Sequence, residues 1–195
     1  RNADRRCRVV ERMTSRDGRS EDGASGIKVV ALGGGHGLAA SLSALRHLTR
    51  ELTGIVTVAD NGGSSGRLRE ELGVLPPGDL RMALAALCSD DDWGRTWASV
   101  LQHRFSSDGP LKDHAVGNLL IAAIWDQLGD HVAGLDLVAE LLNARGRVLP
   151  MAAVPLDIEA EVHLRSAPDR ITLLRGQSQP PSVDGPVVSV RLHRP

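Results

Sequence analysis

The chain has 195 residues, of which 42% are hydrophobic and 24% are charged, and its formal net charge is -1 at pH 7. This length and composition suit a globular domain with a sizeable core. A nearly neutral chain has no overall positive field, so we expect neither nucleic acid nor a membrane surface as a partner. Of the 2 cysteines, Cys7 lies in a polar leader, so a disulfide framework and a cysteine zinc site are both excluded.

Residues 1–26 are charged and rich in glycine and serine, without an apolar central stretch. Such a segment is neither a signal peptide nor a membrane span, so we expect a cytoplasmic protein. Its few apolar side chains cannot offset the entropy of ordering. The sequence therefore predicts a disordered leader over residues 1–26 and one α/β domain over residues 27–195.

The first predicted strand is the apolar run IKVVAL, which leads into the turn GGGHG and then into LAASLSALRHL, a segment with helical spacing. A second apolar run, GIVTVAD, ends in NGGSSG. Two strands separated by one helix predict a parallel βαβ unit. Both glycine-rich turns then follow the carboxyl ends of neighbouring strands, where open α/β sheets bind ligands.

Four helical patterns come next and predict a helical insertion over about residues 79–145. The segments RVLPMA, DIEAEVHL, RITLLRGQ and PVVSVRLH then predict short strands. A frayed polar tail is the alternative for the last part of the chain, because proline and serine interrupt it.

The first glycine turn contains Gly33, Gly34, Gly35 and Gly37. At a junction between strand and helix, backbone N–H groups and the helix dipole form an anion site, so we interpret this turn as a phosphate site. The spacing is not that of the dinucleotide fingerprint, since Leu38 stands where a third glycine or alanine belongs. A tight turn without ligand stays open as an alternative, and His36 contacts either a phosphate or the helix start, with no spacing that indicates metal.

The second turn combines a carboxylate, an amide, glycines and hydroxyls ahead of a helix: Asp60, Asn61, Gly62, Gly63, Ser64, Ser65 and Arg67. Asp60 is suited to a ribose hydroxyl or a divalent ion, the serines to phosphate oxygens and Arg67 to a charge. An N-cap turn ahead of a solvated helix is the alternative.

Two further motifs carry polar side chains at predicted helix starts. In LPPGDLRMAL, Gly78 frees the backbone, Asp79 is predicted to cap a helix, and Arg81 lies in its first turn. In DHAVGNLL, His114 and Asn118 flank Gly117. Each motif fits a binding site or simple packing.

Five ordered stretches, GGGHGL, TVADNGGSSGRLRE, LPPGDLRMALAAL, LQHRF and HAVGNLLIAAI, resemble the signature blocks of the YvcK-like gluconeogenesis factors in the CofD-like family, and the histidine of the first resembles the actinobacterial type. The resemblance spans about residues 27–195. It implies a Rossmann-like parallel sheet with a helical insertion, as in CofD, the 2-phospho-L-lactate transferase of deazaflavin cofactor synthesis. It also implies a later strand and glycine–serine turn, so we expect a chain truncated at its C-terminus with an incomplete sheet.

The resemblance further implies a UDP-sugar ligand, such as UDP-N-acetylglucosamine, or another nucleotide. Carried over by position, the ligand-binding residues would be Gly33, Gly34, Gly35, His36, Gly37, Asp60, Asn61, Gly62, Gly63, Ser64, Ser65, Arg67, Gly78, Asp79, Arg81, His114 and Asn118. We expect a regulatory factor without catalytic residues that links carbon metabolism to cell-wall precursor synthesis and cell shape. Its partner would be an enzyme of that synthesis, and homo-oligomerisation stays open.

Two other functions remain as alternatives. A CofD-like phospholactyl or phosphoryl transferase would use Mg²⁺ at Asp60 to align a nucleotide substrate. Asn61 follows Asp60 where many relatives have a second acidic residue, so we expect no firm metal site. A nucleotide-independent interaction module is the third function.

Overall fold

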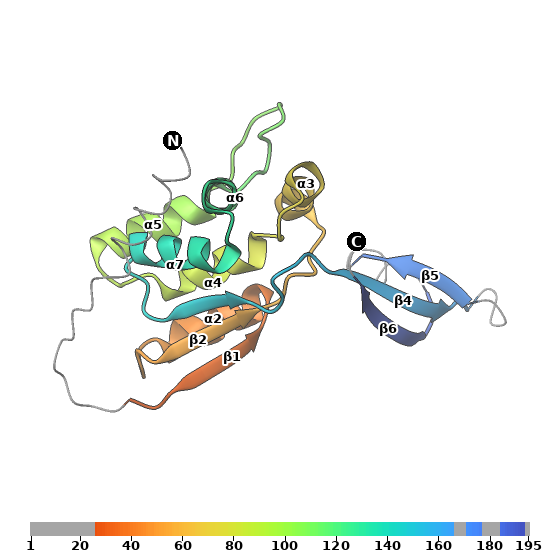
Figure 1. Cartoon of the computed structure of the whole chain (residues 1–195), viewed down its shortest axis with the longest axis horizontal. Helices are drawn as coiled ribbons and strands as arrows, with labels where there is room; N and C mark the ends of the chain where they lie inside the picture. Colours follow the sequence, from red (N-terminus) through yellow and green to blue (C-terminus); the bar gives the residue numbers. More distant parts are fainter. Residues whose placement is uncertain (1–25, 166–170, 177–183, 194–195) are drawn as a thin grey trace.

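The structure, a computed structural model of the chain, describes residues 26–165, 171–176 and 184–193. The predicted leader lies outside the described residues except for Gly26. Figure 1 shows a main body of a sheet covered by helices and a smaller sheet that lies to one side of it.

Three strands form a parallel sheet in the order β1-β2-β3: β1 (Val29–Gly33), β2 (Leu52–Val56) and β3 (Arg147–Pro150). Helix α2 (Gly35–Leu45) connects β1 to β2, which confirms the predicted βαβ unit. The helix lies close to the sheet over Gly54, where an added Cβ would be only 3.1 Å from the Cδ1 atom of Leu42. Because the strands are parallel, the two glycine turns that follow β1 and β2 lie at the same edge of the sheet.

The predicted helical insertion is present between β2 and β3 (Figure 1). Its helices, after α3 (Gly63–Leu72), are α4 (Gly78–Leu87), α5 (Asp92–Gln102), α6 (Val116–Leu128) and α7 (His131–Leu141). Aspartate N-caps begin two of them: Asp91 accepts from the Gly94 amide at 2.7 Å, and Asp130 accepts from the Val132 amide at 2.8 Å. Within the described ranges, no helix has the length and apolar character needed to cross a bilayer.

The core lies between the helices and one face of the parallel sheet. Leu52, Val56 and Val148 point into it and share it with leucines of α2, α4 and α7. On the opposite face, Val30 and Leu32 are 56% and 67% exposed. The apolar run IKVVAL correctly predicted the strand β1, but this strand is buried on one face only. An unbroken apolar run is typical of a strand covered on both faces, whereas helices cover this sheet on one face in the described residues.

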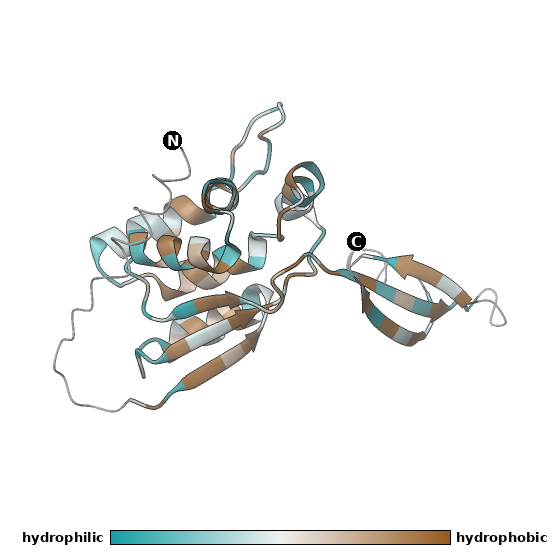
Figure 2. Ribbon diagram, in the orientation of Figure 1, coloured by the Kyte–Doolittle hydropathy of each residue, from teal (hydrophilic) through white to brown (hydrophobic). Residues whose placement is uncertain are grey.

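A second sheet is antiparallel in the order β5-β4-β6: β4 (Asp157–His163), β5 (Ile171–Arg175) and β6 (Val187–His193). The predicted strands therefore form, and the alternative of a polar tail is wrong for β5 and β6. Figure 2 shows apolar residues along β4, β5 and β6. Val190, which pairs with Ala160, and Leu192 are 61% and 60% exposed. Short connections favour antiparallel pairing, because parallel neighbours need a long crossover.

Candidate functional site

A crevice lies at the carboxyl ends of β1 and β2. Its volume is about 480 Å³, and it is lined by Gly34, Gly35, Thr57, Asp60, Asn61, Gly62 and Asp79. Gly34 is the extended N-cap residue of α2, and Gly35 adopts a left-handed φ of 59°. An added Cβ at Gly35 would meet no atom within 4 Å, so the turn opens freely toward the crevice. The start of α2 can therefore receive an anionic group on backbone N–H groups.

The second turn forms one wall of this crevice. The Asp60 carboxylate accepts from the Gly62 amide at 2.9 Å, which fixes an Asx turn ahead of α3. Gly63 begins α3 with a φ of 49°, a value that favours glycine. The carboxylate of Asp60 is thus held at the crevice by the loop itself.

A second carboxylate, that of Asp79, lies in the same crevice. The prediction that it caps α4 is wrong, because the N-cap residue is Pro77 and Asp79 lies inside the first turn. Its side chain instead accepts from the Thr57 hydroxyl at 3.2 Å. In the part of the chain that the structure describes, no three His, Cys, Asp or Glu residues are grouped for a metal. Two carboxylates fit Mg²⁺ only where ligand phosphates complete its coordination.

The predicted phosphate donors Ser64 and Ser65 do not line the crevice. Each is 3% exposed. The Ser65 hydroxyl accepts from the Gly78 amide at 2.9 Å and so joins the start of α3 to the start of α4. The expectation that these hydroxyls face a ligand is therefore not met. They are buried where the starts of α3, α4 and α6 pack together.

Ser64 is the centre of a buried polar network. Its Oγ accepts from the side-chain amide of Asn118 and lies 3.0 Å from Nδ1 of His114. The Ala115 amide also donates to this Oγ, at 3.4 Å, so the hydroxyl proton is left for His114, whose Nδ1 accepts it. Burial, with the Arg67 charge nearby, lowers the pKa of His114, so the neutral ring is favoured.

Arg81 extends this network to α4. It is 3% exposed, and its Nε donates to the side-chain oxygen of Asn118 at 2.9 Å. Burial is the main cause that lowers the pKa of Arg81 to about 10. The positive charge of Arg104 lowers this pKa further, and the negative charge of Asp79 raises it. Its Nη1 atom is buried without a hydrogen-bond partner. The predicted trio Arg81, His114 and Asn118 is thus brought together, but behind the crevice.

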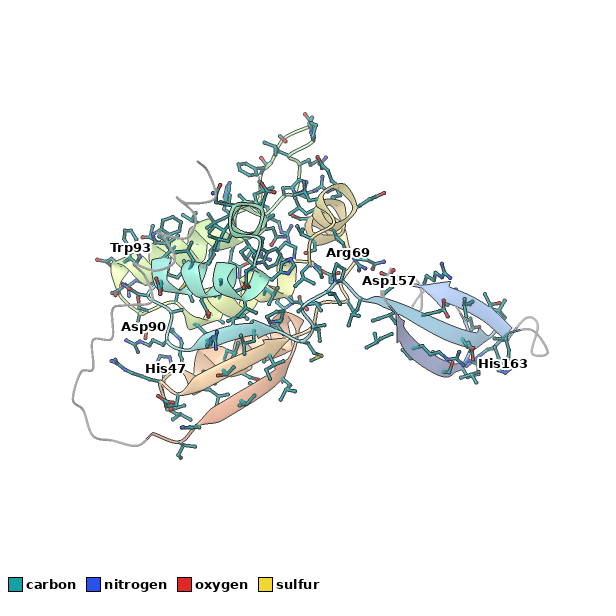
Figure 3. The ribbon with its side chains drawn as sticks, viewed as in Figure 1. His47, Arg69, Asp90, Trp93, Asp157 and His163 are labelled. Carbon is teal, nitrogen blue, oxygen red and sulfur yellow. The ribbon has the colours of Figure 1, made fainter. Side chains whose placement is uncertain are left out.

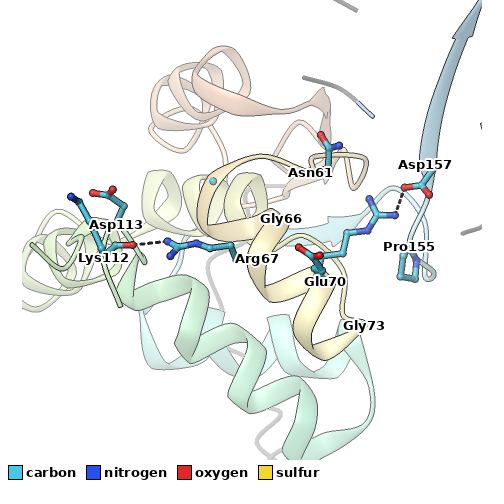
Figure 4. A pocket seen from close by; sticks show the side chains of 11 residues that line it. Asn61, Gly66, Arg67, Glu70, Gly73, Lys112, Asp113, Pro155 and Asp157 are labelled. Carbon is cyan, nitrogen blue, oxygen red and sulfur yellow. Dashed lines mark hydrogen bonds and ion pairs between the residues drawn. The ribbon is translucent and has the colours of Figure 1, made fainter. Parts of the chain in front are cut away.

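A larger pocket, the α3 pocket, lies on the outer side of α3 (Figure 4). Its volume is about 940 Å³, and it is lined by Asn61, Gly63, Gly66, Arg67, Arg69, Glu70, Gly73, Lys112, Asp113, Pro155 and Asp157. Sequence reasoning named three of these, Asn61, Gly63 and Arg67. It missed Lys112 and Asp157 because no local pattern connects α3 to segments so distant in the chain.

The remaining predicted residues lie around these two cavities without lining them. Gly33 ends β1, while His36 and Gly37 are exposed on the first turn of α2. Gly78 is buried against Ser65, whose Oγ would be 2.4 Å from an added Cβ. Contact of any of these residues with a ligand stays a prediction.

Comparisons with known proteins agree on one family. The profile of the family described as 2-phospho-L-lactate transferase CofD matches residues 29–188. A provisionally named gluconeogenesis factor of Mycobacterium leprae is 58% identical over 165 residues, which are 84% of this chain and 46% of that protein. The gluconeogenesis factor of Bacillus subtilis is 44% identical over 135 residues, 69% of this chain and 42% of that protein.

The fold has a match among solved structures as well. A protein of the UPF0052 family from Bacillus halodurans superposes with a TM-score of 0.73 at 36% identity, over 86% of this chain and 51% of that one. The chain spans about half the length of the relatives that it matches. The predicted resemblance is confirmed: this chain belongs to the CofD family and is similar within it to gluconeogenesis factors.

Proposed function

We propose that this chain is the nucleotide-binding part of a cytoplasmic regulatory factor that binds a UDP-sugar and adjusts a partner enzyme of cell-wall precursor synthesis. The observation that carries the proposal is the crevice, in which the open glycine turn of Gly35 faces the carboxylates of Asp60 and Asp79. A diphosphate fits the N-terminus of α2, and a carboxylate fits ribose or sugar hydroxyls.

The similarity to gluconeogenesis factors supports a link to carbon metabolism. A regulatory factor needs to bind its ligand and release it unchanged. The polar network behind the crevice suits this role, because Ser64, His114 and Asn118 satisfy one another and are not presented to a reacting atom.

A CofD-like transferase is the second candidate, because two carboxylates face one crevice and the matching family is named after a transferase. Mg²⁺ held between Asp60, Asp79 and ligand phosphates would align a phosphoryl-type transfer.

Isothermal titration of the chain with UDP-N-acetylglucosamine, with and without Mg²⁺, tests both candidates. For the regulatory factor, Asp60→Asn should weaken binding by roughly 1–2 kcal/mol, equally with and without Mg²⁺, because the amide keeps part of the hydrogen bond. Chromatography of the ligand after incubation should recover it intact. Product formation that disappears in Asp60→Asn, together with an affinity that depends on Mg²⁺, would favour the transferase.

A further inference from the structure

The crevice and the α3 pocket meet at the start of α3. Asn61 lines both cavities, Gly62 lines the crevice and Gly63 lines the α3 pocket. Figure 4 shows Asn61 at one side of the α3 pocket, above the helix that carries Gly66 and Glu70. A ligand with its phosphates at the glycine turn of α2 can therefore extend past Asn61 into the second cavity.

The two cavities differ in chemistry. The wall of the α3 pocket has three basic and three acidic side chains, three glycines, one amide and one proline, and no large apolar side chain. Opposite charges in equal number give no field that would select a polyanion. Carboxylates, the ammonium group of Lys112 and exposed backbone instead offer both acceptors and donors, which suits a neutral group with many hydroxyls.

The walls of the α3 pocket are fixed on two sides by arginines. Arg67 donates to the carbonyl oxygens of Pro110 and Lys112, at 3.2 and 2.6 Å, and so attaches α3 to the loop between α5 and α6. On the other side, Arg69 pairs with Asp157 at 2.5 Å. Figure 4 shows the contact of Arg67 with Lys112, and Figure 3 shows Arg69 beside Asp157. These two guanidinium groups are already used in shaping the pocket.

Glu70 and Lys112 are left for a ligand. Among the described residues, neither side chain makes a hydrogen bond or an ion pair. One offers only acceptors and the other only donors, so together they can recognise the arrangement of hydroxyls on a ring. Both side chains belong to the wall of the same cavity.

We infer that the α3 pocket holds the sugar of the nucleotide sugar while the crevice holds its diphosphate, so that Glu70 and Lys112 determine which sugar is accepted. This inference rests on the proposed function, since it needs a nucleotide sugar as ligand. It adds an orientation, with Asn61 at the boundary, and two residues that select the ligand.

The test compares two probes, UDP and UDP-N-acetylglucosamine, by isothermal titration of the whole chain. Glu70→Gln and Lys112→Met should each weaken binding of the UDP-sugar by roughly tenfold, because glutamine keeps only one of the two acceptor oxygens and methionine has no donor. Binding of UDP alone should change by less than about twofold. The matched controls are Glu71→Gln, at the next position of α3, and Lys28→Met, the other lysine of the chain, at the opposite edge of the sheet.

The outcomes separate this inference from the proposed function. If the unmodified chain binds neither probe, the proposed function fails and the inference with it. If the chain binds UDP-N-acetylglucosamine but the two pocket variants bind it as the controls do, the sugar lies elsewhere and only the inference is overturned. Equal losses for UDP and the UDP-sugar would place the nucleoside in the α3 pocket and likewise overturn the assigned orientation.

Discussion

Gly34→Ala tests whether close packing at the crevice requires a glycine. An added Cβ would lie 2.2 Å from the Thr57 hydroxyl and 2.4 Å from an Asp79 carboxylate oxygen. These two atoms form a hydrogen bond of 3.2 Å, so the methyl group must separate them. Loss of a hydrogen bond to a charged group costs about 1.5–3 kcal/mol. Alanine also reduces the conformational entropy of the unfolded chain, which stabilises the folded state by about 0.4–1 kcal/mol.

The expected net loss is therefore about 0.5–2.5 kcal/mol in the free energy of unfolding, or roughly 1–10 °C in melting temperature for a chain of this size. Circular dichroism at the helix band during heating measures it. Gly37→Ala is the matched control: its Cβ would meet nothing within 4 Å on the same helix, and alanine should stabilise that turn by about 0.5–1 kcal/mol.

A thermodynamic cycle with Thr57→Ala makes the test specific. Without the hydroxyl, the carboxylate of Asp79 is free to rotate away, so Gly34→Ala should cost less in that background. If Gly34→Ala melts at the temperature of Gly37→Ala, or if its cost is the same with and without Thr57, the close approach at this turn is refuted.

Two further predictions concern the buried network. Ser64→Ala should lower the free energy of unfolding by about 1–3 kcal/mol, because His114 and Asn118 lose their common partner. The control Ser41→Ala, on the exposed side of α2, should change it little. Equal melting temperatures of the two variants would argue against the network. The pKa of His114 lies below its ordinary value of 6.5, so the unfolded chain takes up protons first as the pH falls, and stability should decrease below about pH 6.5 in thermal melts. His114→Asn should weaken this dependence of stability on pH. Part of it should remain, because burial also lowers the pKa of His131. A slope of stability against pH that the substitution leaves unchanged would contradict the assignment to His114.

The sequence by itself determined the βαβ unit, the two glycine turns and the four helices of the insertion. These features depend on local signals. Apolar periodicity defines a helix within a few turns, and a left-handed position such as Gly35 favours glycine whatever lies around it. The placement of both turns at one edge follows from parallel pairing alone, so the crevice and its Asp60 were predictable.

Only the tertiary structure decided which polar groups face that crevice. Ser64 and Ser65 follow the same glycines as a phosphate loop would, but their partners bury them: His114 lies in the segment before α6, and Gly78 begins α4. The ion pair of Arg69 with Asp157, which forms one side of the α3 pocket, joins residues 88 positions apart. Local sequence fixes backbone conformation, whereas the exposure of a side chain depends on which distant segment packs over it.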